Sequence, residues 1–541
     1  MYNLSGLTLA SLFATSLALQ ENGILSDPAG TCKSLLTSLS LPNTTIHFAE
    51  YLPAGTNITL TQDFDLASCG YKSQVISVDT CRLAMEVKTS DRSAITLEAW
   101  LPGTGWTGRF LSTGNGGVSG CIQYPDLAYT SGLGFATVGA NNGHNGTRGL
   151  AFANNTDAVH DFADRSLHTG VVLGKQISKA FYGTDHKKSY YLGCSTGGRQ
   201  GFKAVQTYPE DFDGVVAGAP AINYARLTSW SAYPYTLFGK DATDPRFVTV
   251  EQWNTIVHPE VLKQCDGIDG VVDGIIEDPT LCRFRPEAML CAPGKGNETA
   301  ASASCLRTQQ VESIRSLYTD WYGLDGKMIY PRMQPGSEAV ASRVYYTAGE
   351  FPYSSDWFRY VVLNDSTWDP ATFTIKDAKF AGDQNPFDIN TWHGDISAFQ
   401  KTGGKILHYH GQMDAIISSE NSPVYYDMVS RTMGLNSTQL DDFYRFFRVS
   451  GMGHCRGGDG AIMIGNVDET NASLEPQNNV LMRMVDWVEK GNAPENITGV
   501  KFVDGDKTKG VELTRNHCKY PKRNTCVDPA NYKKAEAWTC V

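Results

Sequence analysis

The chain has 541 residues, of which 41% are hydrophobic and 19% are charged, and its formal net charge is −11. This composition is typical of a globular protein with a large core, and the length allows up to about three domains. Nucleic acids and anionic membrane surfaces are disfavoured as partners, because their negative charge repels an acidic protein.

The first element predicted along the chain is a secretion signal. Residues 7–19 form one apolar run that is too short to span a bilayer. Ser16 and Ala18 place small side chains at the −3 and −1 positions of a cleavage site, although the start of the chain lacks Lys and Arg. We therefore predict a signal peptide over residues 1–18 and a soluble, secreted mature protein.

Two further patterns indicate secretion. Acceptor motifs for N-glycosylation, N-x-S/T, begin at Asn43, Asn57, Asn145, Asn154, Asn297, Asn364, Asn436, Asn471 and Asn496. The chain also has 13 cysteines, which in a secreted protein are expected to form disulfides with one cysteine left over.

From about residue 84 to 220, strand-like and helix-like segments alternate. The strand-like segments lie within 94–102, 108–117, 134–142, 189–198 and 213–221. A helix is predicted over 161–181, where apolar residues recur on one face, and a second helix follows residue 198. This alternation predicts an α/β fold with a mostly parallel sheet.

The middle of the chain loses this alternation and is rich in Pro, Trp, Tyr and Asp, so we interpret it as an insertion. The alternation resumes with a strand-like segment at 403–411, a helix at 423–434 and a strand-like segment before 455. The predicted division is a core made of 19–221 and 400–541 and an inserted domain at 222–399.

The stretch "YYLGCSTGGRQG" contains the pattern G-x-S-x-G around Ser195. A β-rich segment precedes it and a helix-compatible segment follows, which is the context that a nucleophilic serine on a sharp turn requires. Such a serine needs a base and a group that orients the base. Asp414 follows the strand-like segment at 405–410, and His454 follows the one at 444–449. Their order, serine then acid then histidine, is the one expected for a serine on this type of turn.

Other interpretations of these residues remain open at this point. A given histidine is more often a structural or surface residue, and Asp414 is also compatible with an ordinary turn. His408 and His410 lie inside a predicted strand and are interpreted as packing groups or as groups that support the site.

Cys194 precedes Ser195 and Cys455 follows His454. If the serine and the histidine meet, a disulfide between their neighbours would join the two loops and close 455 − 194 = 261 residues. Chain entropy would make such a bridge worth about 5 kcal/mol. The alternatives are two free thiols or pairing with other cysteines.

Two glycine- or acid-rich segments are candidate binding sites. "STGNGG" follows an early strand, and the N–H groups of Gly116, Gly117 and Thr196 are predicted to form an oxyanion hole; the alternative is a plain glycine turn. "CDGIDGVVDGIIEDPTLC" holds Asp266, Asp269 and Asp273, whose carboxylates suit Ca²⁺ but equally suit solvated turns.

These motifs resemble the tannase and feruloyl esterase family, and most closely fungal type B feruloyl esterases. The resemblance rests on "GRFLSTGNGG", "DFADRSLH", "YYLGCSTGGRQG", "CDGIDGVVDG", "GGKILHYHGQMD" and "GMGHC", and it spans nearly the whole mature chain. It implies an α/β-hydrolase fold in which the insertion is a large lid. It also implies a catalytic triad of Ser195, Asp414 and His454 and a Cys194–Cys455 bridge.

The resemblance further implies structural Ca²⁺ in the lid and no organic cofactor. The implied calcium ligands are Asp266, Asp269 and Asp273 with the backbone carbonyls of Val271 and Ile275. The implied disulfides are Cys32–Cys81, Cys69–Cys121, Cys265–Cys282, Cys291–Cys305 and Cys518–Cys540, which leaves Cys526 as a departure.

The family divides by the acyl group it releases, and "CSTGGRQG" resembles its feruloyl side, since tannases more often have an acidic or amide residue where Thr196 stands. We therefore expect an extracellular serine esterase, monomeric or homodimeric, that acts on hydroxycinnamoyl esters of plant cell-wall polysaccharides such as xylan. A tannase is the alternative, and a non-catalytic binding glycoprotein on the same fold is the remote one. Four aromatic residues of the insertion have two possible roles, stacking on the phenolic ring of the substrate or ordinary core packing. They are Trp230, Tyr233, Tyr235 and Phe238.

Overall fold

The computed structural model describes residues 25–60, 69–292, 304–347, 349–466 and 474–541. The predicted signal peptide and the acceptor motifs at Asn297 and Asn471 lie outside the described residues. Of the helices in the described part of the chain, none is long and apolar enough to cross a membrane.

One mixed sheet of nine strands organises the fold, in the order β1-β4-β5-β7-β6-β8-β9-β12-β13. From β7 to β13 the strands pair in parallel, as the sequence predicts, whereas β1, β4, β5 and β7 form an antiparallel edge that the sequence interpretation did not include. The strands are β1 (Thr44–Leu52), β4 (Thr80–Lys88), β5 (Ala94–Pro102), β6 (Arg109–Thr113), β7 (Phe135–Ala140), β8 (Lys188–Cys194), β9 (Gly214–Gly218), β12 (Lys405–Gly411) and β13 (Tyr444–Val449).

Helices cover both faces of this sheet. One face packs on α1 (Pro28–Ser38), α4 (Ser166–Tyr182), α5 (Thr196–Thr207) and α14 (Asn421–Met433). The other face packs on α2 (Tyr124–Gly132) and α16 (Val480–Lys490). A mixed sheet between two helical layers, with the parallel strands at its centre, is the α/β-hydrolase fold that the sequence predicts.

The central strands are continuous apolar runs because both of their faces are buried. Nearly every residue of β8 and every residue of β9 is buried. The helix between them, α5, is buried at each position from Thr196 to Val205, and a Cβ on Gly201 would lie 2.8 Å from the ring of Tyr191. Small residues therefore let α5 pack directly on the middle of the sheet.

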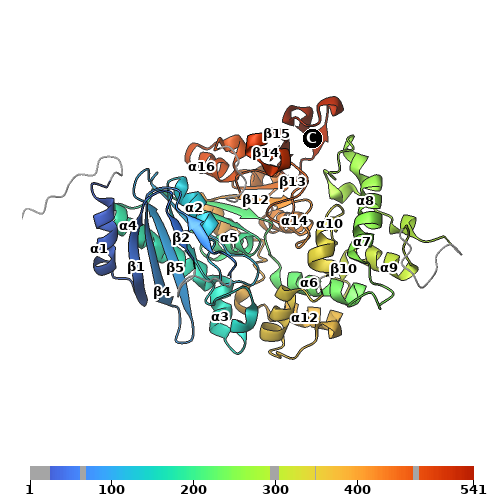
Figure 1. The fold of residues 1–541 in the computed structure, drawn as a ribbon, viewed down its shortest axis with the longest axis horizontal. Coiled ribbons are helices and arrows are strands. Elements are labelled where there is room, and N and C mark those ends of the chain that lie inside the picture. The colour runs from blue at the N-terminus through green and yellow to red at the C-terminus, as the bar shows by residue number, and fades with distance from the viewer. Residues whose placement is uncertain (1–24, 61–68, 293–303, 348, 467–473) are drawn as a thin grey trace, which may run out of the picture.

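Residues 222–399 contribute no described strand to the large sheet and gather on one side of the core (Figure 1). This segment, called the lid here, has helices α6 (Tyr224–Phe238), α7 (Val250–Gln252), α8 (His258–Cys265), α9 (Thr308–Leu317), α10 (Glu338–Ala341), α11 (Pro352–Trp357) and α12 (Ile375–Gln384), with the hairpin β10 (Trp321–Tyr322) and β11 (Met328–Tyr330). The prediction that the segment is a separate domain stays a prediction.

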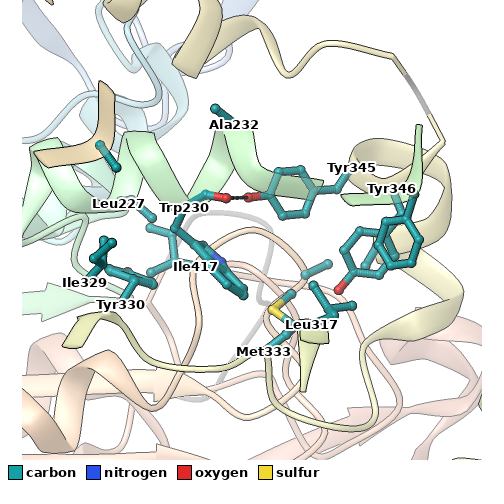
Figure 2. Close-up of a cluster of buried hydrophobic side chains, with 14 of the residues drawn as sticks. Leu227, Trp230, Ala232, Leu317, Ile329, Tyr330, Met333, Tyr345, Tyr346 and Ile417 are labelled. Atoms are coloured by element: carbon teal, nitrogen blue, oxygen red, sulfur yellow. Dashed lines mark hydrogen bonds between the residues drawn. The ribbon is translucent and has the colours of Figure 1, made fainter. Parts of the chain in front are cut away.

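The lid has its own hydrophobic core, shown in part in Figure 2. Trp230 of α6 is fully buried in it, and the Tyr345 hydroxyl donates to the Trp230 carbonyl over 3.3 Å. Ile417, which belongs to the loop after β12, is part of the same cluster. The core of the lid is therefore continuous with the loop that carries Asp414.

The remaining described strands form three further small sheets. They are β2 (Asn57–Thr59) with β3 (Ser73–Val75), β14 (Asn496–Phe502) with β15 (Val511–Cys518), and β16 (Asn524–Cys526) with β17 (Trp538–Cys540). The last two belong to the C-terminal part of the chain, and β14 and β15 lie near α16 and β13 (Figure 1).

Candidate active site

Ser195 lies on a sharp turn between β8 and α5. Its φ of 66° is in the left-handed region, which is costly for any residue except glycine and is held where the surroundings enforce it. The Ser195 N–H donates to the Gly218 carbonyl at the end of β9 over 3.0 Å. A Cβ at Gly198 would lie 2.2 Å from that same carbonyl oxygen, so the turn requires glycine there.

The structure brings Ser195, His454 and Asp414 into one hydrogen-bonded chain. The Ser195 hydroxyl lies 2.9 Å from His454 Nε2, and His454 Nδ1 lies 2.7 Å from Asp414 Oδ2. The His454 side chain is 19% exposed and that of Asp414 is fully buried. The parallel strands β8, β12 and β13 end at the same edge of the sheet, which is why loops far apart in the sequence meet here.

The Asp414 carboxylate is held ionised by its surroundings. Burial raises the pKa of this carboxyl, but the neighbouring His454 and hydrogen bonds from His410 and His454 outweigh burial and hold the pKa well below its usual range. Asp414 Oδ1 also accepts the N–H groups of Ile416 and Ile417 over 2.8 and 2.9 Å. A buried anion with this many donors can orient an imidazole and stabilise its charged form.

A disulfide joins the serine turn to the histidine loop. Cys194 and Cys455 are bonded, with their Cα atoms 6.0 Å apart. This is the bridge that the positions beside Ser195 and His454 predict. The structure pairs the other cysteines as the family resemblance implies, and Cys526 is the free one.

The predicted oxyanion-hole residues lie together beside Ser195. The Thr196 hydroxyl donates to the Gly117 carbonyl over 2.6 Å, and Asn115 N–H donates to Gln200 Oε1 over 2.9 Å. Because Gln200 uses the N–H of Asn115, that group is not available to a substrate. The loop that carries Gly116 and Gly117 is thus fastened to α5 at two points, and both glycines line the same cavity as Ser195.

The cavity above Ser195 has a volume of about 460 Å³, enough for one aromatic acyl group and part of its alcohol. Its lining includes Ser195, Thr196 and His454. The apolar wall includes Tyr224 and Leu227 of α6, Phe351 and Tyr353 of the lid, and Ile416 and Ile417 of the loop after β12. Tyr71 and Leu192 of the core also line the cavity. The lid and the core therefore share the apolar surface that faces the nucleophile.

The aromatic residues singled out in the sequence do not line this cavity. Trp230 and Phe238 are fully buried in the core of the lid, and Tyr233 stacks on Trp321 with ring centroids 4.7 Å apart. Tyr235 is half-buried on the same helix and is not part of the lining either. The alternative interpretation, ordinary core, therefore holds for Trp230 and Phe238, because packing within the lid decides their position.

No motif in the sequence marks the lid aromatic residues that line the cavity. Tyr224 carries no motif, and Phe351 and Tyr353 lie more than 150 residues from Ser195 in the chain. A Cβ at Gly117 would lie 2.6 Å from Tyr353 Cζ, so this ring sits directly on the glycine loop. Only the folded chain reveals that contact.

The predicted calcium loop is compact, with carboxylates that already accept hydrogen bonds. Asp266 accepts the N–H groups of Asp273 and Gly274, and Asp273 forms an ion pair with Arg515 over 2.8 Å. Asp269 Oδ2 is buried and has no hydrogen-bond partner among the described residues. Burial, with the charges of nearby acidic groups, raises the pKa of Asp269 to about 7.

Within the described ranges, no group of three or more His, Cys, Asp or Glu side chains is arranged to hold a metal ion. The loop fits Ca²⁺ through the partnerless oxygen of Asp269 and through hard oxygen donors, provided that the carbonyls of Val271 and Ile275 complete the shell. Calcium in this loop stays a prediction.

A serine, histidine and aspartate chain on loops at the carboxyl ends of parallel strands defines a serine hydrolase of the α/β-hydrolase fold. Residues 81–541 match the family described as tannase and feruloyl esterase. The chain belongs to this family and is a carboxylic ester hydrolase.

Relatives show which branch of the family this chain resembles. A probable feruloyl esterase B-2 of Aspergillus oryzae is 55% identical over 512 residues, which cover 95% of each chain. The crystal structure of feruloyl esterase B from Aspergillus oryzae is 51% identical, with a TM-score of 0.91, and the match covers 95% of this chain and 100% of that one. A tannin acyl hydrolase from Aspergillus niger is 21% identical with a TM-score of 0.73 over 95% and 94% of the two chains, a likeness of fold alone.

The Thr196 hydroxyl offers a test of the oxyanion loop. Thr196→Val keeps the side-chain volume but removes the hydrogen bond to the Gly117 carbonyl, so the loop is less well fixed. We expect kcat to fall about tenfold with little change in KM, because the loop acts on the charged transition state. Thr196→Ser, which keeps the hydroxyl, should retain most of the activity. Steady-state kinetics on a chromogenic ester measure both, and equal kcat values for the two variants would contradict the assignment.

Proposed function

We propose that the protein is a feruloyl esterase that hydrolyses hydroxycinnamoyl esters through an acyl-enzyme on Ser195. The observation that carries the proposal is the hydrogen-bonded chain from Ser195 through His454 to Asp414, at the base of a cavity with an aromatic wall. The relatives named feruloyl esterase B, which match along nearly the whole chain, support the same acyl group.

In the acylation step, the Ser195 oxygen attacks the ester carbonyl carbon while its proton moves to His454 Nε2. Asp414 accepts from His454 Nδ1–H and stabilises the imidazolium that forms. The carbonyl oxygen becomes an oxyanion, which the N–H groups of Gly116, Gly117 and Thr196 stabilise. Collapse breaks the bond to the alcohol oxygen, which takes its proton from His454. Water then repeats the sequence on the acyl-enzyme and releases the free acid.

The cavity wall supports an aromatic acid as the acyl group. Tyr224, Phe351 and Tyr353 offer ring faces and edges, and Leu227 and Ile417 complete an apolar enclosure. A galloyl ester is the alternative substrate. The tannin acyl hydrolase shares the fold at 21% identity, whereas the relatives at 51–55% identity are named for feruloyl esters, so the feruloyl assignment is the better supported one.

We also propose that the enzyme is a secreted glycoprotein that acts on esters of plant cell-wall polysaccharides such as xylan. Six disulfides are typical of proteins that fold in an oxidising compartment. The acceptor asparagines that the structure leaves exposed are Asn43, Asn57, Asn145, Asn154, Asn364 and Asn436. Whether the enzyme is a monomer or a homodimer stays a prediction.

A structural Ca²⁺ in the lid completes the proposal. Asp266, Asp269 and Asp273, with the carbonyls of Val271 and Ile275, would hold it and give a partner to Asp269 Oδ2, which is otherwise buried without one among the described residues. The ion would stabilise the loop bracketed by the Cys265–Cys282 disulfide. None of these five residues lines the cavity above Ser195, so the ion takes no part in the reaction.

A panel of methyl esters tests the proposed activity. Ferulate, caffeate, p-coumarate and sinapate esters should be cleaved with kcat/KM about tenfold or more above that of methyl gallate, because the apolar wall matches the longer acyl group. Ser195→Ala is the control and should release no acid. Faster release of gallate would identify a tannase, and release of no acid by folded protein would favour a binding protein on this fold.

Chelation tests the calcium proposal. Removal of the ion leaves Asp269 Oδ2 without a partner among the described residues, so we expect the melting temperature to fall by several degrees. The initial rate of the protein that remains folded should be unchanged. Asp269→Asn is the matched control, because a variant that has lost the site should not respond to chelator. Immediate loss of turnover in folded protein, or an equal response of the variant, would contradict a structural ion.

A further inference from the structure

A buried row of polar side chains runs from the edge strand of the sheet to Asp414. His408 and His410 lie two residues apart on β12 and therefore on the same face of the sheet. Ser422, at the start of α14, contacts both: its Oγ is 2.9 Å from His408 Nε2 and 2.6 Å from His410 Nδ1. At one end His408 Nδ1 is 2.9 Å from the Tyr444 hydroxyl, and at the other His410 Nε2 is 3.2 Å from Asp414 Oδ2.

The row is closed to solvent along its whole length. His408, His410, Asp414 and Tyr444 are fully buried, and Ser422 is 1% exposed. The ring of His408 lies between Phe446 of β13, at 4.4 Å, and Phe202 of α5, at 5.2 Å. In such surroundings a polar group is costly unless it is hydrogen-bonded, so the four hydrogen bonds are an integral part of the core.

The carboxylate fixes the direction of every hydrogen bond in the row. An ionised Asp414 only accepts, so His410 donates to it from Nε2–H, and in the tautomer that carries its proton on Nε2 the Nδ1 atom is an acceptor. Ser422 therefore donates to His410, and its oxygen accepts from His408 Nε2–H. His408 Nδ1 is then the acceptor for the Tyr444 hydroxyl. All four donors point toward Asp414, and each bond polarises the next.

We propose that His410 is a positioning residue for the reaction, which holds Asp414 in place and withdraws charge from it, and that Ser422, His408 and Tyr444 fix His410 in the required tautomer. His410 and His454 share one oxygen of Asp414. A carboxylate that donates part of its charge to His410 binds the His454 imidazolium less strongly. The shared oxygen therefore couples His410 to the imidazolium that forms on His454 during the reaction.

Other titratable groups also lie around the row. Tyr444 faces Tyr425, Tyr426 and Asp427 of α14, and Tyr330 of the lid faces Asp414. Burial raises the pKa of Tyr444 well above its usual range, so its hydroxyl stays protonated and donates throughout the working pH range. His410 and His454 are the two side chains that contact the shared oxygen of Asp414.

Two variants of His410 separate positioning from packing. Glutamine places its amide near the position of Nε2 and keeps the donor to Asp414, whereas asparagine places its amide near Nδ1 and keeps only the contact with Ser422. We expect His410→Asn to lower kcat about tenfold with KM within about twofold. The acidic limb of the kcat/KM–pH profile of this variant should shift to higher pH by about half a unit, because Asp414 then interacts with His454 alone.

His410→Gln should retain most of kcat and the wild-type acid limb. His517→Asn is the matched control: His517 is a buried histidine whose Nε2 lies 2.9 Å from the Ala461 carbonyl oxygen, and its loss should lower stability but leave the pH profile unchanged. If His410→Asn does not fold, Ser422→Ala removes one hydroxyl from the row and should lower kcat and shift the acid limb in the same direction by a smaller amount.

The inference rests on the proposed esterase function, so the readout includes a reaction that needs no particular ester. The rate at which a fluorophosphonate labels Ser195, measured against pH, reports the same base. Wild-type protein that is labelled but cleaves no feruloyl ester would overturn the proposed function and leave the labelling profile to test the inference. Equal effects of His410→Asn and His410→Gln, or unchanged kcat and acid limb in folded His410→Asn and Ser422→Ala, would overturn the role of His410.

Discussion

The hydrogen bond between Ser195 and His454, 2.9 Å long, is the interaction on which the rest of the structure depends. Its two partners are 259 residues apart in the chain, and three features bring them together. The parallel strands β8, β9, β12 and β13 end at one edge of the sheet, the Cys194–Cys455 disulfide joins the two loops, and buried Asp414 holds the imidazole from behind. The disulfide restricts the separation of the loops, whereas the carboxylate sets the orientation of the ring.

The lid supports the hydrogen-bonded chain of Ser195, His454 and Asp414 and also lines the substrate cavity. Gln334 of the lid donates to the Asp414 carbonyl, and its Oε1 accepts a hydrogen bond from the Ser419 N–H over 3.0 Å. The loop after β12, which carries Asp414, is therefore bound to the lid at two points. The lid core also includes Ile417 of that loop. The lid therefore supplies Tyr224, Phe351 and Tyr353 of the cavity wall and, through Gln334, part of the support of the carboxylate. Changes in the lid are expected to affect both substrate selectivity and the rate of the chemical step.

Much of the fold and of the site could be predicted from the sequence, because the relevant signals are local. The strand at 94–102, the turn at Ser195 and the order of Asp414 and His454 are each read from a short motif or from periodicity. The antiparallel edge, the cavity residues Tyr224 and Tyr353, and the hydrogen bonds of Gln334 leave no such signal. They arise from pairing between separate segments of the chain, which are 80 residues apart for Gln334 and Asp414, and from tertiary packing such as that which buries Trp230.

The most direct test of the account is to identify the covalent intermediate. A chromogenic feruloyl ester is mixed with excess enzyme, quenched in acid within the first turnover, and the peptides are analysed by mass spectrometry. The account predicts a burst of the alcohol product and a feruloyl group on the peptide that contains Ser195, with neither in the Ser195→Ala variant. A feruloyl group on another residue, or product formation with no acylated peptide under conditions where deacylation is slow, would contradict it.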